Sequence, residues 1–213
     1  MKYSAILFDF DGTLAENSFL FLDVLNELSQ EFGFEPIGVE EIPRLRRMGA
    51  KEILTQRLRI PLWNILKIRR LDRAQKRVWR EKVSETEIRL FSGMPQLIKD
   101  IRDRGIVVGI VSSNLLEVIE RAIQSAHVEV DFVHAGSRVF GKAGAIRKVI
   151  KQYQIDSHSV LYVGDEIRDL EACRTVGIPM IGVGWGLNAP EALQARGVVV
   201  VSTLEELRAK ILS

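Results

Sequence analysis

The sequence predicts an α/β fold, a Rossmann-like doubly wound parallel sheet with an inserted all-helical cap domain. Three observations predict it. Short apolar runs recur along the chain, amphipathic segments separate most of them, and about 75 residues after the first run show no strand pattern. The chain has 213 residues, of which 46% are hydrophobic and 27% charged. That composition supports a sizeable buried core and excludes wholesale disorder.

The strand candidates are continuous and rich in β-branched residues, as is typical of strands that are buried on both faces. They cover residues 3–9, 106–112, 132–135, 160–164, 180–183 and 198–201. Amphipathic helices are expected between them, at residues 94–104, 115–126, 143–154, 167–176 and 204–212. Strands that alternate with helices in this way favour a parallel sheet covered on both faces.

Residues 15–89 interrupt the alternation with helical periodicity alone, and they are too many for one crossover helix. We therefore expect a catalytic core formed by residues 1–14 and 90–213, and a helical cap domain formed by residues 15–89. Residues 44–82 contain fourteen Lys or Arg and three Asp or Glu, although the formal net charge of the whole chain is only +2. This asymmetry fits an anionic ligand or a solvated helix surface.

The first candidate site motif is Asp9-Phe-Asp11-Gly-Thr13, directly after the first strand. Active sites of open parallel sheets lie beyond the carboxyl ends of the strands, so both carboxylates are expected there. Two acids buried close together need a cation or a proton. Taken alone, the Asp-Gly pair also fits an ordinary turn.

Two further strands end in polar residues. Residues 160–164 lead into Asp165, Glu166 and Asp169, hard oxygen ligands that suit Mg²⁺ but also suit helix capping. Residues 108–111 lead into Ser112 and Ser113, which suit a phosphate or a helix N-terminus. Lys142 lies between these two segments in sequence, and an ammonium there could neutralise a phosphoryl group.

In order, the chain shows a strand with DxDGT, a strand with Ser, a Lys, and a strand with GDxxxD. This combination resembles the four-motif signature of the haloacid dehalogenase superfamily, over nearly the whole chain, and the helical insertion resembles its C1-type cap. Residues 171–179 (EACRTVGIP) and 184–186 (GWG) resemble the phosphoglycolate-phosphatase-like branch. The resemblance implies an Mg²⁺-dependent phosphatase that acts on a small phosphorylated metabolite through an aspartyl-phosphate intermediate.

The resemblance also implies residue roles. Asp9 is expected to be the nucleophile and Asp11 the general acid and base. Mg²⁺ is expected on Asp9, Asp165 and the backbone carbonyl of Asp11. Phosphate is expected to bind Ser112, Lys142 and the amide of Ser113; Thr13 is expected to shape the loop, and Glu166 and Asp169 to support the metal or Lys142. The sequence departs from the branch after Lys142, where Ala143 replaces a frequent proline.

Cap residues select the leaving group in such enzymes. Arg46, Arg47 and Lys51 are the candidates here, because Arg and Lys bind carboxylates and phosphates. Most of the other basic residues fit a solvated surface. Trp63 and Trp79 are interpreted as cap core. A nucleic-acid partner is not expected, because few aromatic residues interleave with the basic ones.

Alternative functions remain. A phosphosugar mutase of the β-phosphoglucomutase type shares the four motifs, but Phe21 lies where a cap histidine is expected. A 2-haloacid dehalogenase would lack Asp11. A phosphonoacetaldehyde hydrolase uses a cap lysine, from which Lys51 is one residue out of register. A non-catalytic regulator could keep the fold, although intact motifs argue against that reading.

The lone cysteine, Cys173, excludes an intramolecular disulfide and is expected to be a packed side chain in a reducing compartment. No signal peptide or membrane span is evident, because Asp9 and Asp11 follow the first apolar run at once. We therefore expect a cytoplasmic protein with no membrane partner. The sequence does not distinguish a monomer from a dimer.

Overall fold

The computed structural model describes residues 2–17, 20–136 and 141–213, apart from the side chains of residues 84 and 85. In this part of the chain one six-stranded sheet has the order β3-β2-β1-β4-β5-β6, and every neighbouring pair is parallel. The strands are β1 Ala5–Phe8, β2 Val107–Val111, β3 Phe132–His134, β4 Val160–Gly164, β5 Met180–Val183 and β6 Val199–Val201. The α/β fold class is confirmed.

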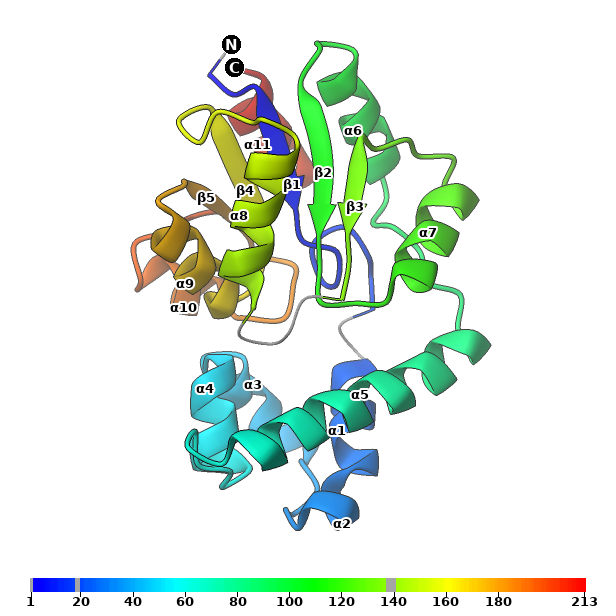
Figure 1. The fold of residues 1–213 in the computed structure, drawn as a ribbon, viewed down its shortest axis with the longest axis vertical. Coiled ribbons are helices and arrows are strands. Elements are labelled where there is room, and N and C mark those ends of the chain that lie inside the picture. Colours follow the sequence, from blue (N-terminus) through cyan, green and yellow to red (C-terminus); the bar gives the residue numbers. More distant parts are fainter. Residues whose placement is uncertain (1, 18–19, 137–140) are drawn as a thin grey trace.

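Helices cover both faces of the sheet (Figure 1). They are α6 Met94–Arg102, α7 Leu116–Ser125, α8 Lys142–Gln152, α9 Ile167–Val176, α10 Pro190–Gln194 and α11 Leu204–Leu212. Along β1 alternate side chains point to opposite faces. Ile6 and Phe8 pack with α6, α7 and α11, whereas Ala5 and Leu7 pack with α8 and α9. Strand β1 is therefore buried on both sides, as its apolar sequence predicts.

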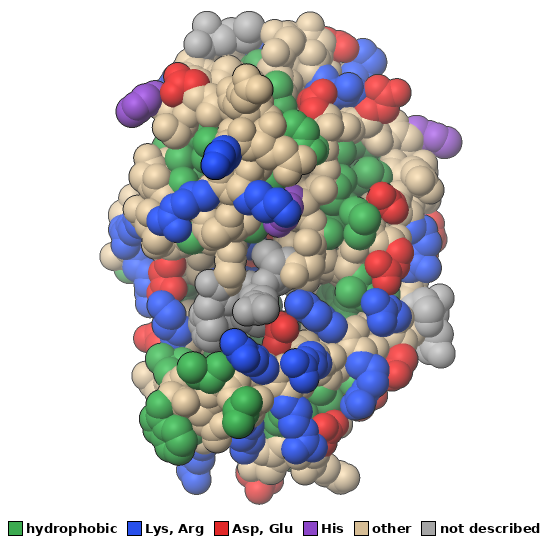
Figure 2. Space-filling view, viewed as in Figure 1, with side chains coloured by type: hydrophobic (Ala, Val, Ile, Leu, Met, Phe, Trp, Pro, Cys, Tyr) green, Lys and Arg blue, Asp and Glu red, His purple; other side chains and the backbone are tan. Residues whose placement is uncertain are grey.

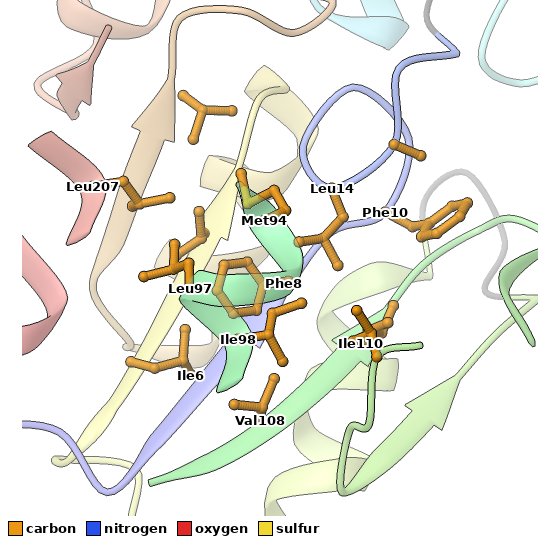
Figure 3. Packing of buried hydrophobic residues seen from close by; sticks show 14 of the residues in the cluster. Ile6, Phe8, Phe10, Leu14, Met94, Leu97, Ile98, Val108, Ile110 and Leu207 are labelled. Atoms are coloured by element: carbon orange, nitrogen blue, oxygen red, sulfur yellow. The ribbon is translucent and has the colours of Figure 1, made fainter. Parts of the chain in front are cut away.

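Figure 3 shows the larger core cluster, in which Phe8 of β1 lies against Met94, Leu97 and Ile98 of α6. All four side chains are at most 1% exposed. Burying a side chain of this size contributes roughly 1.5–3 kcal/mol. Helix α6 begins with Met94 after Gly93, and Pro95 occupies its first turn, where a missing N–H costs nothing.

Residues 20–85, between β1 and α6, form a helical layer beyond the carboxyl ends of the strands (Figure 1). Its elements are α1 Leu20–Glu27, α2 Ser29–Phe32, η1 Val39–Glu41, α3 Ile42–Leu45, α4 Ala50–Glu52, η2 Ile53–Arg57 and α5 Ile65–Glu85. This layer has its own hydrophobic cluster, which includes Leu25, Leu28, Ile60 and Val78. In the described residues no helix is both long and apolar enough to cross a membrane.

Candidate active site

The site lies where the carboxyl ends of β1, β2 and β4 meet. Asp9 follows β1 directly, Ser112 follows β2 and Asp165 follows β4. The chain first winds from β1 towards β3 and then crosses to β4 on the other side of β1. In open α/β sheets such a reversal leaves a crevice that binds ligands. The topology therefore brings residues from distant parts of the sequence to one place.

Asp9 is 1% exposed, and its carboxylate faces the ammonium of Lys142, with Nζ 2.7 Å from Oδ2. None of the described residues donates a hydrogen bond of good geometry to either carboxylate oxygen. A buried carboxylate without such donors is costly. Oδ2 of Asp9 therefore has the ion pair with Lys142, and Oδ1 accepts no hydrogen bond from the described residues.

Three buried carboxylates, those of Asp9, Asp165 and Asp169, have one oxygen each within 4.8 Å of the others. Burial raises the pKa of Asp165 well above its usual value, and the charges of Glu166 and Asp9 raise it further. A divalent cation would relieve this repulsion, and hard oxygen donors are the ligands that Mg²⁺ prefers. The chemistry of this donor set therefore fits Mg²⁺.

The turn after β1 is shaped around Asp165. Thr13 Oγ1 donates to Asp165 Oδ1 over 2.7 Å, and the Leu187 amide donates to Oδ2 over the same distance. Gly12 has φ 71°, and a Cβ on it would lie 2.5 Å from Asp165 Oδ2. Only glycine meets both demands. These contacts hold the Asp165 side chain in one position.

Asp11 is oriented by two amides. Asn17 Nδ2 and Asn114 Nδ2 both donate to its Oδ1, each over 2.6 Å. Burial first and the charge of Asp9 second raise the pKa of Asp11 to about 6, although the two amide hydrogen bonds lower it. A carboxyl with such a pKa can both release and accept a proton near neutral pH.

Lys142, the first residue of α8, is fully charged in this setting. Burial alone would lower its pKa, but the carboxylates of Asp169 and Asp9 raise it above its ordinary value. Asp169 also forms an ion pair with Lys142 and accepts a hydrogen bond from the Glu166 amide over 3.1 Å. Asp169 thus fixes the ammonium beside Asp9.

Ser112 and Ser113 lie beside the carboxylates at the end of β2. Ser112 is fully buried, and its Oγ accepts a hydrogen bond from the backbone N–H of Asn114 over 3.0 Å. Ser113 Oγ accepts a hydrogen bond from Arg168 over 3.2 Å. Arg168 also pairs with Glu166, so the Ser113 hydroxyl borders a pair of charged groups.

The three basic candidates of the helical layer differ in their surroundings. Arg46 donates from Nε to the Leu187 carbonyl and from Nη2 to the Gly186 carbonyl, over 3.0 Å each. Lys51 forms an exposed ion pair with Glu171. Arg47 is exposed, and its side chain has no ionic or hydrogen-bonded partner among the described residues. Figure 2 shows many Lys and Arg side chains over this layer.

Sequence reasoning missed several residues at this site. Asn17 and Asn114 contact Asp11, and Arg168 lies beside Ser113. Polar residues close to the motifs in sequence were the only available signal. The interpretation of the tryptophans as cap core was wrong for Trp63, which is 80% exposed. Trp79 does pack against the hydrophobic cluster of the helical layer, but it also packs against the larger core cluster around the sheet.

The chain is similar to known phosphatases over most of its length. A family model described as haloacid dehalogenase-like hydrolase matches residues 6–183. The phosphoglycolate phosphatase of Synechococcus elongatus is 32% identical over 90% of this chain and 88% of its own. The N-acetylmuramic acid 6-phosphate phosphatase of Pseudomonas aeruginosa is 25% identical over 90% of this chain and 86% of its own. Among solved structures, that of a predicted phosphatase from Clostridium acetobutylicum has a TM-score of 0.80 and 20% sequence identity. The match covers 99% of this chain and 98% of that one.

Proposed function

Because the chain belongs to the haloacid dehalogenase-like hydrolase family, we propose that this phosphoric monoester hydrolase uses Mg²⁺ and an aspartyl-phosphate intermediate. Its proposed substrate is a small phosphorylated metabolite of the phosphoglycolate type. The observation that carries the proposal is the buried Asp9, whose carboxylate faces the ammonium of Lys142 and lies in one cluster with the carboxylates of Asp165 and Asp169. A relative 32% identical is a phosphoglycolate phosphatase, which supports this substrate class.

In the first step an oxygen of Asp9 attacks phosphorus, and the bond from phosphorus to the leaving oxygen breaks. Asp11 gives its proton to that oxygen, so an alcohol leaves and Asp9 carries the phosphoryl group. In the second step Asp11, now ionised, takes a proton from water as the water oxygen attacks phosphorus. The bond from phosphorus to the Asp9 oxygen breaks, inorganic phosphate leaves, and Asp9 is a free carboxylate again.

The remaining groups bind and orient the phosphate. We assign the phosphate oxygens to Lys142, Ser112 and the Ser113 amide, and the metal to Asp9, Asp165 and the carbonyl of Asp11. Bound Mg²⁺ supplies positive charge that offsets the charge on the phosphate oxygens.

The groups around these residues hold them in place. Asp169 holds Lys142, and Glu166 supports the same region through Arg168. Thr13 holds the Asp165 side chain.

Residues 15–89, which include the helical layer, are proposed to act as a cap domain that selects the leaving group. Arg46, Arg47 and Lys51 remain the candidates for reading a second anionic group. Arg47 is the strongest of the three, because the side chains of Arg46 and Lys51 already bind core residues.

A phosphosugar mutase and a non-catalytic regulator are the alternatives. Against the mutase, the histidines of the chain are His127, His134 and His158, none within residues 15–89.

The deciding experiment is a screen of phosphorylated metabolites with Mg²⁺, in which released phosphate is measured for the wild type and Asp9→Asn. We expect turnover by the wild type and its loss in the variant, with an unchanged far-UV circular dichroism spectrum. Wild-type rates in Asp9→Asn would exclude the aspartyl-phosphate mechanism. No turnover of any phosphate ester by the wild type would favour the regulator.

A further inference from the structure

Trp79 links the helical layer to the catalytic acid. It lies near the C-terminal end of α5, which runs beneath the carboxyl ends of the strands (Figure 1). Its ring packs against both hydrophobic clusters, the one inside the helical layer and the one around the sheet. Its indole N–H donates to Asn114 Oδ1 over 2.9 Å. The contact therefore exists only while the helical layer is docked on the core.

The second link is Asn114, which is 6% exposed and follows β2. Its Oδ1 accepts hydrogen bonds from the Trp79 indole and from the Leu115 amide, the latter over 2.7 Å. Both are groups that can only donate, so they require the oxygen of the Asn114 amide on their side. The Nδ2 group must then face Asp11, where it donates to Oδ1 over 2.6 Å.

The third link concerns which oxygen of Asp11 can meet the substrate. Asn17 and Asn114 both donate to Oδ1. An oxygen that already accepts two N–H groups has little capacity for a further contact, so Oδ2 is the oxygen available for proton transfer. No described residue donates a side-chain or backbone hydrogen bond to Oδ2. That oxygen is therefore left for the leaving group or for water.

We propose that Trp79 is a positioning residue that aligns Asp11 through Asn114, so that the general acid is in place only when the helical layer is docked. The inference rests on the proposed role of Asp11. It extends that role, because the indole of Trp79 in the helical layer helps to hold the carboxyl group of Asp11 in the core. A purely structural Trp79 would affect all substrates equally.

The test compares Trp79→Phe with the wild type on p-nitrophenyl phosphate and on two alkyl phosphates, phosphoglycolate and β-glycerol phosphate. Phenylalanine keeps the ring packing and removes the N–H. Loss of one neutral hydrogen bond predicts a fall in kcat/KM of about 3- to 10-fold for alkyl phosphates, because this ratio reports the first step, in which the leaving oxygen needs a proton. The kcat/KM for p-nitrophenyl phosphate should fall by less than about 2-fold.

Two control variants separate this effect from a loosened cap. Trp63→Phe alters an exposed tryptophan of the same layer and should leave both rates unchanged. Val78→Ala removes buried packing next to Trp79 and should slow alkyl and aryl substrates by the same factor. Asn114→Ala should lower the alkyl rate, and adding Trp79→Phe to it should have no further effect. Equal losses on both substrate types in Trp79→Phe would overturn the proposal.

A second measurement does not need turnover. In ¹⁵N-labelled protein the indole N–H signal of Trp79 is identified by its disappearance in Trp79→Phe. Asn114→Ala should shift this signal and leave that of Trp63 in place, and an unmoved Trp79 signal would overturn the proposal. If Asp9→Asn retains activity, the proposed function fails. If activity depends on Asp9 but Trp79→Phe slows alkyl and aryl phosphates equally, only the inference about Trp79 fails.

Discussion

The ammonium of Lys142 lies 2.7 Å from Oδ2 of Asp9, and both side chains are almost completely buried. Lys142 pairs with Asp169 as well. The lysine therefore neutralises part of a dense carboxylate cluster. In the proposed mechanism it also stands where a transferring phosphoryl group would meet Asp9. Under that proposal Lys142 matters for stability as well as for catalysis.

Removing this lysine should destabilise the fold. We expect Lys142→Gln to lower the free energy of unfolding by about 3–5 kcal/mol without Mg²⁺, because it leaves buried carboxylates without their counter-ion. Urea unfolding in the presence of EDTA measures the loss. The matched control is Lys51→Gln, whose ion pair with Glu171 is about half exposed; it should cost less than about 1 kcal/mol. Similar losses in the two variants would contradict the argument.

Binding of Mg²⁺ should stabilise the folded protein. At a concentration 100-fold above Kd the gain in unfolding free energy is about 2.7 kcal/mol, since the unfolded chain has no preformed site. Differential scanning calorimetry with Mg²⁺ or with EDTA should show the corresponding rise in Tm. Asp165→Asn should remove most of this rise, whereas Asp103→Asn, at an exposed ion pair, should keep it. An equal rise in Asp165→Asn would place the metal elsewhere.

Asp11→Asn should reveal the general acid through the leaving group. General acid–base catalysis is typically worth about 10²–10⁴-fold, and alkyl phosphates should lose that much. Losses for p-nitrophenyl phosphate should be smaller, because its leaving group needs less protonation. The kcat/KM values for both substrates decide the matter, because they report the first step, and equal losses in kcat/KM would argue against an acid role for Asp11.

Most of the fold could be predicted because its signals are local. Strand β4 and helix α9 have the predicted bounds, since continuous apolar runs and 3.6-residue periodicity lie within single segments. Helix α10 was missed, because its five residues after Ala189 are too few to show a period. Strand ends were predicted less accurately: β1 spans Ala5–Phe8, whereas residues 3–9 were expected.

The residues of the site also divide into those that a local pattern predicts and those that it does not. The motif residues meet because parallel strands bring their carboxyl ends together, and that rule needs only the order of elements. The contact of Trp79 with Asn114 joins positions 35 residues apart on two different layers. No local pattern encodes the way α5 lies on the core. The sequence also singles out Arg46 as a basic candidate, but it does not predict the hydrogen bonds of its side chain to the carbonyls of residues 186 and 187.

Cys173 should be inert in the folded protein. Its side chain is 1% exposed, and burial raises the pKa of the thiol well above its usual range, so almost no thiolate forms at neutral pH. Titration with a thiol-reactive dye should label the native chain slowly and label one thiol per chain in urea. Rapid labelling without urea would show that this region of α9 opens readily.

The last prediction separates two basic neighbours of the helical layer, Arg46 and Arg47. Arg46 holds this layer against the core: its side chain bonds to the carbonyls of Gly186 and Leu187, and its own carbonyl accepts the Ala189 amide over 2.7 Å. Arg46→Ala should therefore disturb docking and slow every substrate by a similar factor. Arg47 has no such bonds among the described residues and is free to meet a ligand.

If Arg47 binds the carboxylate of a substrate, Arg47→Ala removes a charge-assisted contact worth roughly 1.5–3 kcal/mol. The value of kcat/KM for phosphoglycolate should then fall by about 10- to 150-fold, and that for p-nitrophenyl phosphate should hardly change. Lys51→Ala serves as the control, because its ion pair with Glu171 keeps it at the surface. The ratio of the two kcat/KM values is the quantity to compare, since a disturbed cap slows both substrates alike. An unchanged ratio in Arg47→Ala would mean that Arg47 does not bind the substrate, and an altered ratio in Lys51→Ala would transfer that role to the lysine.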